Sequence, residues 1–257
     1  MSTLEQATTR ATRLLAPNPG PMTLEGTNTW VLREPAGDAC VVVDPGPLDE
    51  GHLNRVAEHG PIDLIVLTHG HSDHAEGAGR LRELTGAPIV ARDPSLCVDA
   101  QPLGGGAAQH AAGVEWLTIV TPGHSSDSVC LVVPADRALL TGDTILGRGT
   151  TVVAHPDGRL GDYLDSLRRL RDLAESDVDV LLPGHGPVLD APLETLDYYL
   201  QHREERLEQV RAAMADGAAD AADVVRRVYA DVDPGLWPAA ELSVRAQLEY
   251  LGGQAGP

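Results

Sequence analysis

The sequence predicts an α/β fold in which two β-sheets pack together, with helices outside and a small helical region at the C-terminus. Apolar runs of strand length come in two batches, and each batch is followed by segments with helical spacing. Polar residues recur where the strands stop. We therefore expect a site at the edges of the two sheets.

The apolar periodicity of each segment predicts its element. Strands are expected at residues 27–32, 39–43, 62–67, 87–91, 114–121, 128–133, 138–141 and 178–182. Helices are expected at residues 49–59, 73–84 and 163–174, and again from residue 193 almost to the end of the chain. Residues 134–137 have the composition of a hairpin turn, whereas residues 101–113 resemble a loop of small residues.

Residues 68–74 carry three histidines and one aspartate directly after an apolar run, in the order Thr-His-Gly-His-Ser-Asp-His. His69, His71 and Asp73 alternate and so point to one side of the strand end, whereas His74 begins a helix. Ser72 is expected to cap that helix, because Asp73 cannot easily serve both as a cap and as a metal ligand. Packing alone does not explain such a cluster.

Three further candidate ligands, His124, Asp143 and His185, follow later strands. Each is preceded by a glycine, which lets the backbone and a ligand approach closely. With the first cluster they make seven donors, five of nitrogen and two of oxygen. This set is too large for one tetrahedral ion and suits two divalent ions, for which we expect Zn²⁺.

A pair of ions in such a site predicts hydrolytic chemistry. Two divalent ions about 3.5 to 4 Å apart share a water, lower its pKa toward 7 and hold the resulting hydroxide against a carbonyl or phosphoryl centre. A carboxylate suits the bridging position because its two oxygens can face different ions. A site of this kind needs no nucleophilic side chain.

The motif T-H-x-H-x-D-H, followed by distant His, Asp and His residues at strand ends, resembles the metallo-β-lactamase-fold hydrolase superfamily over roughly residues 20–190. The resemblance implies a four-layer αββα sandwich. It implies a first metal on His69, His71 and His124, a second on Asp73, His74 and His185, and Asp143 as the bridge. Asp73 would also position the attacking water as a catalytic residue. The bridging aspartate is more similar to glyoxalase II and ribonuclease Z than to true β-lactamases.

Residues 18–30 and 199–206 are similar to the lactamase-beta-2-like branch, whose members have a small winged-helix-like C-terminal domain. The resemblance implies a catalytic domain over residues 1–190 and a helical, winged-helix-like region over residues 191–257. Residues 221–229 and 236–251 would supply helices of this region. The chain continues after Leu251 without a basic strand hairpin, which weighs against a nucleic-acid role for the region.

The composition favours a small-molecule substrate over RNA. The 257 residues include 38 acidic and 19 basic residues, for a formal net charge of −19, and every basic residue is arginine. This balance opposes a broad surface that tracks phosphates. Aromatic residues make up 3% of the chain, so platforms for stacking single-stranded bases are few.

Cysteine usage and hydropathy predict a cytoplasmic protein with no membrane partner. Cys40, Cys97 and Cys130 are widely spaced and are expected to be reduced thiols. Residues 1–20 lack the apolar block of a secretory signal, and the chain contains no apolar run of the roughly 20 residues that a membrane span needs. The sequence gives no indication of oligomeric state.

Four residues outside the ligand set are candidates for a structural role or for contact with the substrate. Asp44 ends a strand at Asp-Pro-Gly and is expected to be structural or to orient a ligand histidine. Asn28 and His155 are candidates for contacting the substrate, although a turn asparagine and a loop histidine are more often structural. Arg203 is expected to be an ion partner on a helix surface.

The leading hypothesis is a dinuclear metal-dependent hydrolase that uses a metal-bridging hydroxide on an ester-like or thioester-like small molecule. One alternative is an endoribonuclease that cleaves single-stranded RNA. A second is an iron-dependent redox enzyme with the same ligand cage, and a third is a metal-stabilised binding or structural module. Substrate specificity is expected to lie in the loops at residues 24–28, 102–113 and 146–160.

Overall fold

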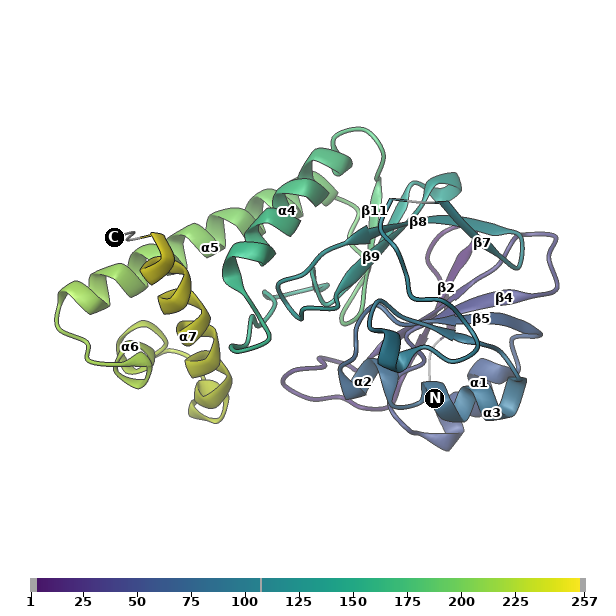
Figure 1. The fold of residues 1–257 in the computed structure, drawn as a ribbon, viewed down its shortest axis with the longest axis horizontal. Coiled ribbons are helices and arrows are strands. Elements are labelled where there is room, and N and C mark those ends of the chain that lie inside the picture. Colours follow the sequence, from purple (N-terminus) through teal and green to yellow (C-terminus); the bar gives the residue numbers. More distant parts are fainter. Residues whose placement is uncertain (1–3, 107, 255–257) are drawn as a thin grey trace.

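The structure is a computed structural model that describes residues 4–106 and 108–254. Its centre is a pair of packed sheets (Figure 1). The first sheet has the strand order β1-β2-β3-β4-β5-β6 and the second has the order β11-β10-β9-β8-β7. The two batches of strands predicted from the sequence therefore form two sheets.

The first sheet is built from the N-terminal part of the chain. Its strands are β1 (Leu4–Gln6), β2 (Ala11–Leu15), β3 (Asn28–Leu32), β4 (Cys40–Val43), β5 (Ile62–Val66) and β6 (Ile89–Val90). Neighbouring strands from β1 to β4 are antiparallel, and β5 is parallel to both β4 and β6. The sequence predicts no element for residues 4–15, so the β1-β2 hairpin is an addition to the expected sheet.

The second sheet is built from the middle of the chain. Its strands are β7 (Ala108–Ala111), β8 (Val114–Val120), β9 (Val129–Val133), β10 (Ala138–Gly142) and β11 (Val180–Pro183). All pairs are antiparallel except β10 with β11. The hairpin turn at residues 134–137 is confirmed as the 3₁₀ segment η2 (Pro134–Asp136) between β9 and β10. The loop predicted at residues 101–113 is wrong at β7, which pairs with β8.

Strand residues alternate between a core shared by the sheets and the helical layers outside. In β9, Val129, Leu131 and Val133 belong to the cluster between the sheets, whereas Cys130 and Val132 pack under the outer helices. This alternation follows from the twofold side-chain period of a strand. The strands are apolar on both faces because both faces are covered, which confirms the four-layer αββα sandwich.

Helices cover the outer face of each sheet. The helices of the chain are α1 (Glu50–Ala57), α2 (Ser72–Ala75), α3 (Ala78–Thr85), α4 (Leu160–Ala174), α5 (Pro192–Ala215), α6 (Ala221–Val228) and α7 (Trp237–Gln254). Two further 3₁₀ segments are η1 (Pro94–Leu96) and η3 (Pro234–Leu236). Helices α1 and α3 pack on the first sheet, and α4 with the first part of α5 packs on the second.

The helix expected at residues 73–84 is interrupted. It consists of α2 and α3, separated at Gly77, where an added Cβ would lie 2.8 to 2.9 Å from Leu53 and from two backbone carbonyls. The expected cap at Ser72 is wrong, because Ser72 is the first residue of α2 and His71 takes the N-cap position without a side-chain hydrogen bond. His71 cannot cap with its ring because that ring faces the other histidines.

The C-terminal helices form a cluster of their own at one end of the molecule (Figure 1). Val224 and Val225 of α6 and Val244 of α7 pack against the last turns of α5. Helix α5 also contributes Leu196 and Leu207 to the core under the second sheet, so it joins both clusters. A division of the chain between residues 190 and 191 stays a prediction.

Cys40, Cys97 and Cys130 are free thiols, and two of them are buried. Within residues 4–106 and 108–254, none of the helices combines the length and the apolar character that crossing a membrane requires.

Candidate metal centre

The seven predicted ligands meet at one edge of the sandwich. The loop after β5 and helix α2 together supply four of them, and β8, β10 and β11 are each followed by one. Strands β8, β10 and β11 run in the same direction, because β9 is antiparallel to its two neighbours and β11 is parallel to β10. Their carboxyl ends therefore lie at the same edge, where ligands commonly bind in α/β sheets.

Three histidines form the first group of the cluster, with ligand atoms within 4.8 Å of one another. His69 Nε2 lies 3.1 Å from His71 Nδ1, and His124 Nε2 lies 3.0 Å from the same atom. His69 is buried, whereas His71 is exposed to solvent. Three nitrogens that converge this closely have the composition of an imidazole metal site with an open side.

The second group consists of Asp73, His74 and His185. His74 Nε2 lies 3.1 Å from His185 Nε2, and Asp73 Oδ2 lies 3.1 Å from His185 Nε2. Both histidine rings are fully buried, but the Asp73 side chain is 27% exposed. The group thus offers two nitrogens and one oxygen, again with one side open to solvent.

Asp143 lies between the two groups. Its Oδ1 is 3.4 Å from His74 Nε2, and its Oδ2 is 3.4 Å from His185 Nε2 and 3.8 Å from His124 Nε2. One carboxylate therefore reaches histidines of both groups. Among the described residues, the buried Oδ1 has no hydrogen-bond partner, which is the state expected of an oxygen that is available to a cation.

The rings of His124 and His185 are held by their other nitrogen. His124 Nδ1 donates to the carbonyl of Val152 at 2.8 Å, and His185 Nδ1 donates to the carbonyl of Gly26 at 3.1 Å. A carbonyl only accepts, so Nδ1 carries a hydrogen and Nε2 is the nitrogen that would present a lone pair to a metal ion. The donor set and these Nδ1 contacts fit divalent metal ions.

Asp44 holds His74 in the same way. The carboxylate accepts from His74 Nδ1 at 2.9 Å, from the backbone N–H of Thr68 at 2.8 Å and from the Thr68 hydroxyl at 2.7 Å. Asp44 is buried and has a positive φ of 52°, so the chain adopts a strained turn to place it there. This contact is the one expected of a residue that orients a ligand histidine.

Charges within the cluster compensate one another. Burial lowers the pKa of His69 and of His124, which keeps both rings neutral. Burial opposes the charged form of His185 as well, but the Asp143 and Asp73 carboxylates beside Nε2 raise its pKa to about 9, and a cation held between them would take the place of that proton. Burial acts against the Asp143 carboxylate, yet His74 and His185 hold its pKa well below the usual range. The Asp143 carboxylate thus stays ionised inside the site.

The two other candidates for substrate contact make contacts outside the three ligand sets. Asn28 is buried, and its amide donates to the carbonyls of Pro183 and Gly186, so that it holds the loop carrying His185. His155 belongs to none of the three ligand sets and lies 3.6 Å from Glu249 of α7.

Arg203 is not the surface ion partner that we expect from the sequence. Its side chain is 6% exposed, and its guanidinium donates to the carbonyl of Thr151 and lies over the ring of Tyr163. The spacing explains the error, because Tyr199, Arg203 and Leu207 are four residues apart on the buried face of α5.

The loop at residues 143–152 is fixed by contacts that the sequence did not reveal. Tyr163 donates from its hydroxyl to the carbonyl of Thr144 at 2.7 Å, and the Thr151 hydroxyl donates to the carbonyl of Asp143 at 2.7 Å. Tyr199 accepts from the backbone N–H of Leu146 at 2.8 Å. The buried tyrosines were the available signal, since a buried hydroxyl needs a partner.

Known protein families match both parts of the chain. Residues 22–185 match the metallo-beta-lactamase superfamily, and residues 221–252 match the beta-lactamase associated winged helix domain. The first match covers most of the sandwich and all seven clustered residues. The chain therefore belongs to the metallo-beta-lactamase superfamily, and it is a metal-dependent hydrolase.

Individual relatives show which branch of the superfamily the chain resembles. It is 32% identical over 270 residues to a beta-lactamase-like protein 2 homolog from Drosophila melanogaster, covering 95% of this chain and 88% of the relative. It is 31% identical over 244 residues to an atrochrysone carboxyl ACP thioesterase from Aspergillus fumigatus, covering 86% of this chain and 73% of the relative. The resemblance to the lactamase-beta-2-like branch is thus confirmed.

Solved structures share the fold. A metallo-beta-lactamase family protein from Thermus thermophilus superposes with a TM-score of 0.80 at 23% identity, covering 95% of this chain and 93% of the other. A beta-lactamase domain protein from Burkholderia ambifaria gives a TM-score of 0.79 at 22% identity, covering 97% and 88%. The four-layer sandwich and its C-terminal helices therefore recur together.

Proposed function

We propose that this chain is a dinuclear metal-dependent hydrolase of small-molecule thioesters or related esters. The observation that carries the proposal is the position of Asp143, whose two carboxylate oxygens lie near histidines of both ligand groups. A single-ion site would need neither the second group nor a shared carboxylate.

The ligands divide between the two ions according to the two groups. His69, His71 and His124 would hold the first ion, Asp73, His74 and His185 the second, and Asp143 would contact both. When bound, two divalent ions lower the pKa of a shared water and polarise the scissile carbonyl. We propose Zn²⁺ because imidazole and carboxylate ligands suit it.

The chain's own residues would orient the reactants. Asp73 is partly exposed, and its Oδ2 lies 3.1 Å from His185, so a water on its exposed side would be held at the edge of the cluster. The carboxylates of Asp44 and Asp143 keep His74 fixed from two sides. Exposed His71 leaves the cluster open to substrate, which does not suit a purely structural metal site.

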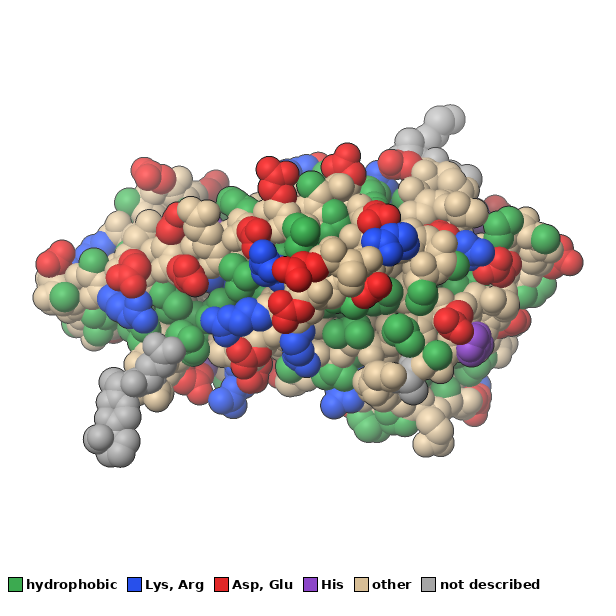
Figure 2. Space-filling model, turned by 90° about the horizontal axis from the view of Figure 1, so that it is seen from above, with side chains coloured by type: hydrophobic (Ala, Val, Ile, Leu, Met, Phe, Trp, Pro, Cys, Tyr) green, Lys and Arg blue, Asp and Glu red, His purple; other side chains and the backbone are tan. Residues whose placement is uncertain are grey.

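Two observations support a thioester or ester rather than RNA. One relative is a thioesterase that acts on an acyl carrier protein, and its likeness covers 86% of this chain. On the face drawn in Figure 2, arginine side chains lie among carboxylates instead of forming a continuous basic strip. An RNA backbone needs such a strip for electrostatic attraction.

The test is turnover of a substrate panel by the zinc-loaded protein. We expect hydrolysis of S-acylpantetheine thioesters, followed with a thiol reagent, and no cleavage of a fluorescent single-stranded RNA at the same enzyme concentration. Asp162→Asn, at an exposed carboxylate on α4, serves as a matched control for Asp143→Asn. RNA cleavage without thioester turnover would overturn the proposal.

A further inference from the structure

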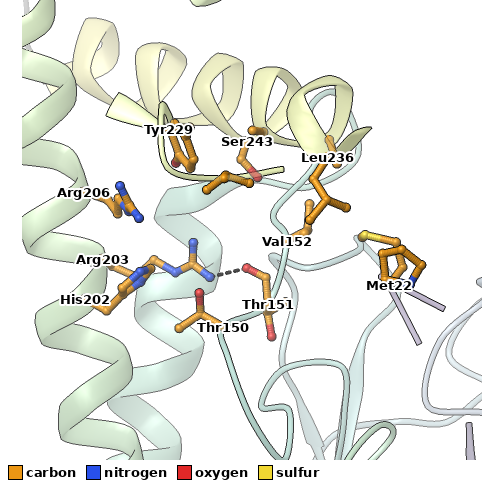
Figure 3. A pocket seen from close by; sticks show the side chains of 14 residues that line it. Met22, Thr150, Thr151, Val152, His202, Arg203, Arg206, Tyr229, Leu236 and Ser243 are labelled. Carbon is orange, nitrogen blue, oxygen red and sulfur yellow. Dashed lines mark hydrogen bonds between the residues drawn. The ribbon is translucent and has the colours of Figure 1, made fainter. Parts of the chain in front are cut away.

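A pocket of about 260 Å³ lies between the loop at residues 150–152 and the C-terminal helices (Figure 3). Helix α5 contributes His202, Arg203 and Arg206 to it, and the opposite wall comes from α7 and the segment before it. Of the 14 residues that line the pocket, two are arginines and none is an aspartate or glutamate. In a chain with twice as many acidic as basic residues, such a lining is unusual.

The two arginines have no acidic partner among the described residues, in contrast to most of the arginines in this chain. Arg203 is buried, donates to the carbonyl of Thr151, and has a buried Nε with no hydrogen-bond partner. Arg206 lies over the ring of Tyr229, with its guanidinium carbon 4.6 Å from the ring centre, and donates to Gln209 at 2.9 Å. A buried cation without a counter-ion is costly, so an anion would complete this pocket.

His202 adds a neutral donor or acceptor to the same wall. Burial, followed by the nearby charges of Arg203 and Arg206, lowers the pKa of His202 to about 4. Its Nδ1 is buried and has no hydrogen-bond partner among the described residues. Two positive charges and a neutral imidazole therefore lie side by side in this wall of the pocket.

The wall of this pocket also supports the metal centre. Thr151 donates from its hydroxyl to the carbonyl of Asp143 at 2.7 Å, while its own carbonyl accepts from Arg203. The carbonyl of Val152 holds His124 at 2.8 Å, and Val152 also lines the pocket. One short strip of backbone thus has the clustered ligands on one side and the arginines on the other.

We propose that this pocket binds an anionic group of the substrate, a phosphate or a carboxylate, while the thioester lies at the metal centre. This inference rests on the proposed function, since it names the class of thioester that the site selects. Guanidinium groups bind both kinds of anion through paired hydrogen bonds. The anion belongs either to the thiol part, as in a 4′-phosphopantetheine thioester, or to the acyl part, as in a dicarboxylic acid monothioester.

The experiment compares kcat/KM for three thioesters with matched chains. S-butyrylpantetheine is neutral, S-butyryl-4′-phosphopantetheine carries a phosphate on the thiol part, and S-succinylpantetheine carries a carboxylate on the acyl part. We expect wild type to prefer one anionic thioester by roughly tenfold or more. Arg206→Gln should remove most of this preference, and Arg211→Gln, an exposed residue of α5 paired with Glu208, should retain it.

Measurements of binding test this inference independently of the proposed hydrolytic function. The corresponding thioethers, S-butylpantetheine, its 4′-phosphate and S-(3-carboxypropyl)pantetheine, cannot be hydrolysed, and calorimetry gives their affinities. Preference for an anionic thioether that Arg206→Gln removes supports the pocket, even if no thioester is hydrolysed and the proposed function fails. Equal affinity for all three thioethers, or a preference that Arg206→Gln leaves unchanged, overturns the inference. Arg206 is chosen because replacing Arg203 would also remove its hydrogen bond to the loop.

Discussion

Asp44→Asn tests how the fold prepares His74 for metal binding. The buried carboxylate accepts three hydrogen bonds, of which the one from His74 Nδ1, at 2.9 Å, fixes the ring so that Nε2 faces the other ligands. Asparagine has the same shape but only one acceptor oxygen. Its amide nitrogen, placed toward His74, would donate to Nδ1 and move the ring hydrogen to Nε2.

The expected loss follows from that change of tautomer. Removing a partner that orients a metal ligand typically costs 10- to 100-fold in metal affinity, or about 1.4 to 2.8 kcal/mol. Zinc affinity, measured by competition with a chromophoric chelator, should fall by this amount in Asp44→Asn. Asp162→Asn, which changes an exposed carboxylate of α4, should bind zinc as wild type does. An Asp44→Asn variant that binds zinc as tightly as wild type would refute the reasoning.

Further predictions concern stability. His52 is buried with a pKa lowered to about 4, mainly by burial. As the pH falls from about 6.5 to 4 the unfolded chain binds a proton that the folded chain does not, so roughly 3 kcal/mol of stability is lost in this window. Urea unfolding at several pH values should show that the free energy of unfolding falls less between pH 6.5 and 4 in His52→Gln than in wild type. An equal fall in both proteins would contradict this. In Gly123→Ala the added Cβ would lie 2.3 Å from the backbone of Tyr163 at a φ of +136°, so unfolding in urea should show a loss of about 3 kcal/mol or more. Gly79→Ala, whose Cβ meets nothing within 4 Å in α3, should be neutral or stabilising.

Much of the cluster could be predicted because its histidines and aspartates directly follow apolar runs of strand length. His69 and His71 follow a buried strand within a few residues, and His124, Asp143 and His185 follow other strands. The apolar pattern of the strands was therefore enough to locate all five. Strands β8, β10 and β11 run in the same direction, so the residues that follow them meet at one edge of the second sheet.

Other features depend on backbone atoms and tertiary packing, which leave no mark in the sequence. The carbonyls of Gly26 and Val152 hold His185 and His124, yet any residue could supply a carbonyl. Strand β7 contains small and polar residues and forms because β8 offers an edge to pair with. Arg203 was misplaced because an arginine on a helix is usually exposed, whereas this one is held by a loop that is distant in sequence.

The same packing connects the C-terminal helices to the loop beside the site. Helix α5 reaches from the core under the second sheet to the cluster formed with α6 and α7. Its residues Tyr199 and Arg203 contact the loop that follows Asp143. A winged-helix region fused to this sandwich is therefore positioned to influence substrate binding, as the proposed anion pocket requires.

The number of zinc ions that each chain binds tests the central claim most directly. The metal-free protein is titrated with zinc, and bound metal is determined by elemental analysis after removal of the free ion. We predict two ions per chain in wild type and fewer in Asp143→Asn, because this variant lacks the carboxylate that lies between the two groups. Saturation of the wild type at one ion with full thioesterase activity, or two ions with full activity in Asp143→Asn, would contradict the account.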